Sequence, residues 1–179
     1  MRSQRLAAFT LGLIALSCCA VVQAIPIPAP PQLGTKSYVL MDANSGQILA
    51  ASNPDLRTEP ASLTKLMTAY VVFHALKDGV IHLDDPVTIS VKAWRMGGSR
   101  TFVKVGSQVS VENLIQGMVV QSGNDATVAL AEKVGGTEDT FVELMNKYAQ
   151  QRGMTNSHFG DASGLTADED ALTTIASYS

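Results

Sequence analysis

The chain has 179 residues, of which 46% are hydrophobic and 16% are charged, and its formal net charge is −3. This composition is that of an ordinary globular protein with enough apolar residues for one sizeable core. Because its lysines and arginines form no cluster, the chain offers no basic surface to nucleic acid, and we exclude nucleic acid as a partner.

Residues 1–24 have the pattern of a secretory signal peptide. Arg2 and Arg5 precede an apolar run from Leu6 to Val22, and small residues precede a cleavage site after Ala24, with Ala20 as a second site. A retained membrane anchor is the alternative, which the short apolar stretch disfavours. We therefore expect an exported protein of the bacterial periplasm or cell surface, with inner-membrane association left open.

Both cysteines, Cys18 and Cys19, lie inside this leader. Cleavage after residue 24 leaves a mature chain without cysteine, so we expect no disulfide, thiol nucleophile or cysteine-bound metal there. Lipidation of Cys18 is an alternative, but it requires a leucine-like residue three positions earlier, where Ala15 stands.

Residues 25–35 form a proline-rich lead-in, too dense in proline for a helix or a central strand. Two strands are expected at about 36–42 and 47–51, joined by a turn at 43–46 whose Asn and Gly tolerate positive φ. A two-stranded hairpin alone is marginal in water. The pattern therefore predicts further strands, absent from this chain, that complete a sheet.

Apolar residues then recur at helical spacing. They predict a helix that begins at Ser62, ends before Asp78-Gly79 and turns one face to the core. The residues that define this face are Leu63, Leu66, Met67, Tyr70, Val71 and Leu76.

The remaining chain is predicted to be mostly helical. A short strand is expected at 87–90 and an irregular loop at 94–102, in which we expect Trp94 to be buried rather than to line a groove. Ser110 and Thr137 have the residue type of helix N-caps. Three helices are expected, at about 110–119, 124–135 and 137–152.

Ser62 and Lys65 allow two interpretations. Residues three apart on a helix share a face, so the hydroxyl and the ammonium group can meet. A serine becomes a good nucleophile when a base takes its proton, and a lysine is such a base if burial or a nearby cation lowers its pKa. Alternatively, Ser62 is a helix cap and Lys65 is a solvated surface charge.

Ser122-Gly123-Asn124 stands between two predicted helices, where a turn can present both polar side chains. The structural alternative is a capping residue followed by a glycine for the turn. The chemical interpretation is that the serine passes a proton to a leaving group and the asparagine hydrogen-bonds a substrate amide.

Ser62-Leu-Thr-Lys65 followed by Ser122-Gly-Asn124 resembles the active-site serine penicillin-recognising enzymes. The surrounding stretches MDANSGQILA, PASLTKLMTAY, QSGNDA and GMTNSHFGDASGL are similar to those of the low-molecular-mass D-alanyl-D-alanine carboxypeptidases, serine peptidases of family S11. The resemblance implies an α/β fold of the β-lactamase/transpeptidase type. Residues 36–179 would form a partial serine D,D-peptidase domain, with the N-terminal strands and helical lobe but without the C-terminal strands.

The resemblance also implies a role for each motif residue. Ser62 would be the nucleophile that forms an acyl-enzyme, Lys65 the general base, Ser122 the proton relay, and Asn124 a substrate-binding residue. The substrate would be a peptidoglycan stem peptide ending in D-Ala-D-Ala, and β-lactams would be inhibitors. The chemistry requires no metal and no other cofactor.

The third motif of the family, Lys-Thr-Gly or a close relative, does not occur in the 179 residues. We interpret the chain as an N-terminal fragment, with membrane attachment through a later region left open. The tail from Ala167 matches the family poorly.

Three other functions compete with this interpretation. A D,D-endopeptidase of the same family and a non-catalytic wall-binding fragment remain alternatives. A β-lactamase is disfavoured, because Glu138 and Glu143 lie on a predicted helix rather than on a loop that activates water. We expect structural roles for His74, His82 and His158, a solvated loop at Asp84-Asp85, and core positions for Met67, Met118 and Met145.

Overall fold

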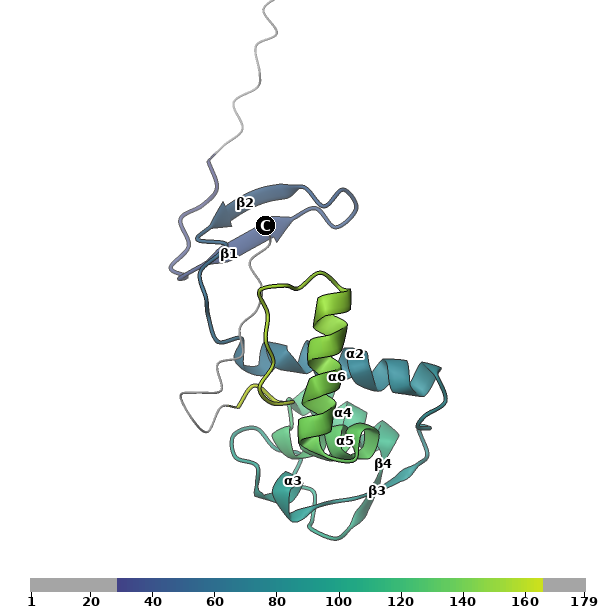
Figure 1. The fold of residues 1–179 in the computed structure, drawn as a ribbon. Helices are drawn as coiled ribbons and strands as arrows, with labels where there is room; N and C mark the ends of the chain where they lie inside the picture. The colour runs from purple at the N-terminus through teal and green to yellow at the C-terminus, as the bar shows by residue number, and fades with distance from the viewer. Residues whose placement is uncertain (1–28, 166–179) are drawn as a thin grey trace, which may run out of the picture. The chain divides into compact units, whose positions relative to one another are not determined.

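The computed structural model describes residues 29–165. The chain divides into two compact units between Thr35 and Lys36, and every helix and strand in the described range belongs to the second unit. Figure 1 shows the ribbon coloured by residue number. The expected signal peptide at 1–24, the first residues of the proline-rich lead-in and the tail from residue 166 lie outside the described residues.

The first element is an antiparallel hairpin, as predicted. Strand β1 (Tyr38–Met41) pairs with β2 (Ile48–Ser52), with Val39 opposite Ala51 and an irregular register after Leu40. The strands begin and end within two residues of the expected positions.

Asp42 closes the turn between these strands. Its Oδ1 accepts hydrogen bonds from the backbone N–H groups of Ser45 (2.7 Å) and Asn44 (3.2 Å). The backbone hydrogen bond from Ser45 is the main cause that lowers the pKa of Asp42. Gly46 has the positive φ (72°) that the turn requires.

A 3-10 turn, η1 (Ala61–Leu63), leads into the first long helix, α2 (Thr64–Lys77). The helix therefore begins two residues later than predicted, and it ends before Asp78-Gly79 as expected. Its buried face differs from the predicted one. The side chains it buries are those of Thr64, Lys65, Met67, Thr68, Val71, Val72 and Ala75.

Leu63 and Leu66 are the clearest errors in the predicted core face. They are 57% and 71% exposed, whereas Thr64 and Lys65 are 1% and 7% exposed. Hydrophobic spacing identified the helix but assigned its first turn to the wrong side, because contacts with a distant loop bury the polar residues there.

A second antiparallel pair joins β3 (Pro86–Thr88) and β4 (Gln108–Ser110), with Val87 opposite Val109. The prediction of a strand near 87–90 is confirmed in part. Its partner was not predicted, because three residues are too few to show a strand periodicity.

The expected loop at 94–102 begins inside a short helix, α3 (Val91–Arg95), which Ser90 caps by accepting a hydrogen bond from Ala93 N–H at 2.9 Å. Trp94 is 44% exposed, so the prediction of its burial is wrong. The helix turns the small Ala93 side chain into the core instead.

Asp85 is not simply a solvated loop residue. Its carboxylate lies 3.1 Å from Lys133 Nζ, and the hydrogen bond from that ammonium group is the main cause that lowers the pKa of Asp85. Asp84 is exposed, so the expectation of a solvated pair holds for one member only.

Three helices follow: α4 (Val111–Gln121), α5 (Asn124–Gly135) and α6 (Glu138–Gln151). The predicted caps are confirmed. Ser110 accepts a hydrogen bond from Asn113 N–H at 3.3 Å, and Thr137 accepts one from Thr140 N–H at 3.1 Å.

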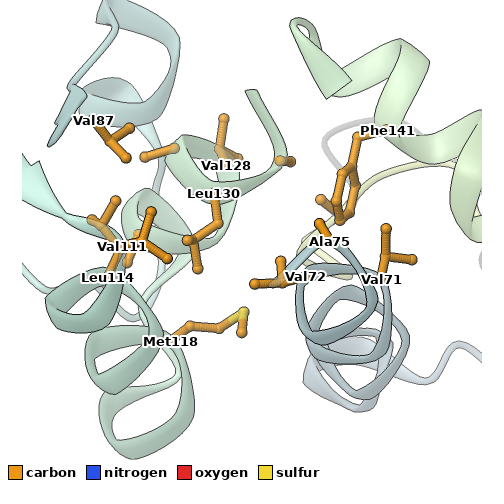
Figure 2. Packing of buried hydrophobic residues seen from close by; sticks show 14 of the residues in the cluster. Val71, Val72, Ala75, Val87, Val111, Leu114, Met118, Val128, Leu130 and Phe141 are labelled. Atoms are coloured by element: carbon orange, nitrogen blue, oxygen red, sulfur yellow. The ribbon is translucent and has the colours of Figure 1, made fainter. Parts of the chain in front are cut away.

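Helix α5 is central to the core, because it contacts α2, α3, α4 and α6 as well as β3. Figure 2 shows Leu130 of α5 beside Leu114 of α4, and Met118 of α4 pointing towards Val72 of α2. The predicted core positions of the methionines are confirmed for Met67, Met118 and Met145, which are 8%, 2% and 0% exposed.

No helix within residues 29–165 is long and apolar enough to cross a lipid bilayer.

Leu114 tests this core directly. It is fully buried where α4 packs on α5, so Leu114→Ala should lower the free energy of unfolding by about 2–5 kcal/mol through lost burial and a cavity. Urea unfolding monitored by circular dichroism measures the change. Val80→Ala, at a position that is 65% exposed, should alter stability by less than about 0.5 kcal/mol. Equal losses in the two variants would contradict this description of the core.

Candidate active site

Ser62 lies in the 3-10 turn and Lys65 in the first turn of α2. Ser62 caps neither element: the N-cap residues are Pro60 for η1 and Leu63 for α2, and neither makes a side-chain capping bond. Ser62 is exposed, whereas Lys65 is buried. The alternative of a capping serine and a solvated lysine is therefore wrong.

Lys65 Nζ makes two hydrogen bonds as a donor. It donates to Ser62 Oγ at 3.3 Å and to the backbone carbonyl of Ser163 at 2.8 Å. Burial lowers the pKa of Lys65, since desolvation disfavours its charged form, and the Asp161 carboxylate acts in the opposite direction. The neutral amine of Lys65 therefore forms at a lower pH than that of an exposed lysine. It lies within hydrogen-bond distance of the Ser62 hydroxyl.

Ser122 ends α4 in the left-handed conformation (φ 54°, ψ 34°). A non-glycine residue rarely adopts this conformation, which costs about 1 kcal/mol. Gly123 follows, and a side chain there would collide with Thr101 Oγ1. Thr101 therefore packs directly against the turn between α4 and α5, which carries the half-buried Ser122 side chain.

One pocket brings three of the predicted site residues together. Its volume is about 200 Å³. Ser62 and Lys65 line it from η1 and α2, and Ser122 lines it from the end of α4. The other lining residues are neutral and mostly apolar: Leu63, Leu66, Ala69, Met118 and Val119.

Asn124 does not line this pocket. It is 5% exposed at the start of α5, and its Nδ2 donates to the carbonyl of Gly97 at 2.9 Å. Its Oδ1 is buried and accepts no hydrogen bond within residues 29–165. The hydrogen bond from Nδ2 therefore fixes the side-chain amide, while Oδ1 can still accept a hydrogen bond.

None of the three histidines lines the pocket that contains Ser62. His74 stacks on Tyr148 with ring centroids 5.0 Å apart, His82 Nδ1 is 3.8 Å from Asp85, and His158 is exposed. Residues 29–165 contain no group of three or more His, Cys, Asp or Glu side chains arranged to hold a metal ion.

A family model described as D-alanyl-D-alanine carboxypeptidase, peptidase family S11, matches residues 25–177, which is most of the chain. The chain belongs to the S11 peptidase family. The resemblance inferred from the serine, lysine and asparagine motifs is thereby confirmed.

Two curated relatives and one solved structure place the chain within the family. The D-alanyl-D-alanine carboxypeptidase DacA of Haemophilus influenzae is 55% identical over 139 residues, covering 76% of this chain and 35% of that protein. The D-alanyl-D-alanine endopeptidase of Pseudomonas aeruginosa is 35% identical over 172 residues, covering 93% of this chain and 54% of that protein. The crystal structure of penicillin-binding protein 5 from H. influenzae matches with a TM-score of 0.77 at 51% identity, covering 82% of this chain and 43% of that one.

The structural match confirms the predicted fold class, an α/β fold of the β-lactamase/transpeptidase type. The chain spans 35% of the length of the H. influenzae carboxypeptidase and about half of the endopeptidase.

Asp125, which follows Asn124, anchors a neighbouring loop, a role that the sequence did not reveal. The side chain is 1% exposed, and its carboxylate accepts hydrogen bonds from the backbone N–H groups of Thr101 (2.8 Å) and Val103 (3.2 Å). The neighbouring Asn124 N–H donates to Ser99 at 2.7 Å. These bonds fasten the loop at 97–103 to the start of α5. An acidic residue in the first helical turn already interacts favourably with the helix dipole, so its residue type alone does not indicate a loop anchor.

We predict that Asp125→Ala releases this loop. Hydrogen bonds to a charged group contribute about 1.5–3 kcal/mol each, so amide exchange at Thr101 and Val103 should accelerate at least about tenfold. Hydrogen exchange with mass spectrometry measures the effect. Asp139→Ala, on the exposed side of α6, should leave the loop unchanged. Unaltered exchange in Asp125→Ala would show that the carboxylate does not anchor the loop.

Proposed function

We propose that this chain is the N-terminal part of a serine D-alanyl-D-alanine carboxypeptidase, which removes the terminal D-alanine of peptidoglycan stem peptides. The observation that carries the proposal is the shared pocket, where a buried lysine contacts an exposed serine beside Ser122. Membership of the S11 family and 55% identity to a carboxypeptidase support it.

In the proposed acylation step, Ser62 Oγ attacks the carbonyl carbon of the penultimate D-alanine. The hydroxyl proton passes to the neutral Lys65 amine, which lies 3.3 Å from Oγ. The backbone N–H of Ser62 supplies one donor to the oxyanion of the tetrahedral intermediate.

Collapse of this intermediate breaks the peptide bond. Ser122, which lines the same pocket from the end of α4, relays the proton from the Lys65 ammonium to the departing amine of the terminal D-alanine. Water then hydrolyses the Ser62 ester, which releases the shortened stem peptide and regenerates the enzyme. Every group in these steps is a side chain or backbone amide, so the proposal requires neither metal nor other cofactor.

Asn124 has the chemistry of a substrate-binding residue in this scheme. Its Oδ1 lacks a partner and has the capacity to accept a hydrogen bond from a substrate amide, although it is buried outside the pocket in this structure, and the bond from Nδ2 to Gly97 fixes the side chain. Substrate binding would thus satisfy a buried acceptor. We assign the carboxylate-binding Lys-Thr-Gly motif to the part of the full-length protein beyond this chain, since the relatives are much longer.

The same nucleophile should react with β-lactams, whose strained amide resembles the scissile peptide bond in its reaction with serine.

We also propose that residues 1–24, which lie outside the described range, direct export to the periplasm or cell surface. Association with the inner membrane through a later region belongs to this proposal, and fractionation of cells that express the full-length protein tests it.

A D,D-endopeptidase is the second candidate, because the P. aeruginosa endopeptidase matches 93% of the chain. Its identity of 35%, against 55% for the carboxypeptidase, favours the carboxypeptidase. Release of D-alanine from a pentapeptide, measured beside cleavage of a cross-linked muropeptide dimer, distinguishes the two activities.

Ser62→Ala tests the nucleophile. In the full-length protein this substitution should abolish covalent labelling by a fluorescent penicillin, measured after denaturing electrophoresis, because no ester can form. Ser107→Ala, which removes a hydroxyl that donates to the Lys104 carbonyl of its own loop, should label normally. Labelling that persists in Ser62→Ala would reject Ser62 as nucleophile, and absence of labelling in the unaltered protein would favour a non-catalytic wall-binding role.

The pH dependence of acylation tests the base. Because burial lowers the pKa of Lys65, the neutral amine should form at a lower pH than in an exposed lysine, whose pKa is about 10.4. The acylation rate should rise with pH and reach half its maximum below that value. Lys65→Arg, which retains a charge that cannot be lost, should reduce acylation by about 10²–10⁴-fold, whereas Lys77→Arg on the exposed end of α2 should not. An unchanged rate in Lys65→Arg would exclude general-base catalysis by this lysine.

A further inference from the structure

Asp161 organises a tight turn beside Lys65. Its Oδ1 accepts hydrogen bonds from Gly164 N–H (2.5 Å), Ser163 N–H (2.6 Å) and the Ser163 hydroxyl (3.0 Å). Its Oδ2 is buried and makes no hydrogen bond within the described part of the chain. One carboxylate oxygen therefore shapes the turn, while the other takes no part in these hydrogen bonds.

This turn directs a carbonyl group at the lysine. Ser163 is 1% exposed, and its backbone carbonyl accepts a hydrogen bond from Lys65 Nζ at 2.8 Å. Gly164 follows at φ 75°, and any side chain there would collide with the Ala61 carbonyl. The turn thus lies directly against the segment that carries Ser62.

Neighbouring helices hold the turn in place. Thr68 Oγ1 of α2 donates to the Ala162 carbonyl at 2.6 Å, and Ala162 N–H donates to Glu138 Oε1 of α6 at 3.0 Å. The other oxygen of Glu138 is 2.9 Å from Lys92 Nζ of α3. Because three helices contribute to these contacts, the position of the Asp161 carboxylate relative to Lys65 is well defined.

Within residues 29–165, Asp161 is the charged group whose field acts on Lys65. The pocket wall contributes hydroxyl and apolar side chains from η1, α2 and α4, and Glu138 of α6 is engaged with Lys92 and the Ala162 amide. Burial lowers the pKa of Lys65, and the Asp161 carboxylate opposes this shift by favouring the ammonium form.

We propose that Asp161 is a positioning residue for Lys65: it holds the Ser163 carbonyl against the lysine and stabilises the proton that Lys65 takes from Ser62. This inference rests on the proposed function, since it assigns Asp161 a part in the same acylation step. A base with more affinity for the proton gives a larger driving force for transfer, while a smaller fraction of it is neutral at a given pH. Asp161 therefore sets the balance between the strength and the availability of the base.

Asp161→Asn in the full-length protein separates charge from shape, because the asparagine Oδ1 can still accept the bonds from Ser163 and Gly164. Loss of the charge should move the acid limb of the acylation profile to lower pH. Acylation should become several-fold faster at a pH on that limb and slower on the plateau. A fluorescent penicillin followed by stopped flow gives both rates.

The protonation of Lys65 can be followed without activity, through the ¹³Cε shift of Lys65 in lysine-labelled protein. Its titration midpoint should fall in Asp161→Asn and stay unchanged in Asp84→Asn, which removes the same charge from an exposed loop. This readout decides the inference even if the unaltered protein forms no acyl-enzyme and the proposed function fails.

Two results would overturn the proposal. The first is an identical Lys65 titration in the unaltered protein and in Asp161→Asn. The second is a uniform loss of acylation at every pH without a shift of the midpoint, which would show that Asp161 supports only the shape of the loop.

Discussion

A lysine ammonium buried at the start of a helix is the constraint on which this structure depends. Removing such a charge from water costs several kcal/mol unless nearby groups compensate for it. Here the compensation comes from the Ser163 carbonyl, 2.8 Å from Lys65 Nζ, and from the field of the Asp161 carboxylate. These groups are about 100 positions away in sequence, so the site exists only when the loop packs on α2.

This requirement explains the unusual pattern of the first turns of α2. Thr64, Lys65 and Thr68 are buried there, while Leu66 is exposed. Thr68 uses its hydroxyl to hold the loop through Ala162, at 2.6 Å. The helix therefore buries polar groups to build the pocket, and its later residues Val71 and Val72 join the apolar core.

Strained backbone is found at the same place. Ala61, just before Ser62, has φ 48°, and Ser122 has φ 54°. Each is a non-glycine residue in the left-handed region, a conformation that the surrounding structure must enforce. Ala61 is next to the pocket and Ser122 lines it, whereas Asn53 (φ 46°) and Phe102 (φ 62°) adopt the same conformation without lining it, so left-handed backbone is not confined to the site.

The sequence predicted those parts of the molecule that local chemistry determines. The hairpin, the Ser110 and Thr137 caps and the long helices follow from turn residues, capping preferences and periodicity. The convergence of Ser62, Lys65 and Ser122 on one pocket agrees with the motif interpretation. The roles of those residues remain proposals.

The sequence could not predict features that depend on distant contacts. The buried face of α2 and the exposure of Trp94 follow from tertiary packing. Asp125 accepts hydrogen bonds from backbone N–H groups, and Ser163 contributes its backbone carbonyl. Because other residues carry the same backbone groups, the sequence does not indicate these contacts. The stretch around Asp161 was recognised as family-like, but its position beside Lys65 required the structure.

The central claim is that Ser62 forms a covalent ester with the help of Lys65. The most direct measurement is to incubate the full-length protein with benzylpenicillin, digest it and locate the adduct by tandem mass spectrometry. We expect one penicilloyl group, attached to Ser62. An adduct on another residue, or no adduct in folded protein, would contradict it.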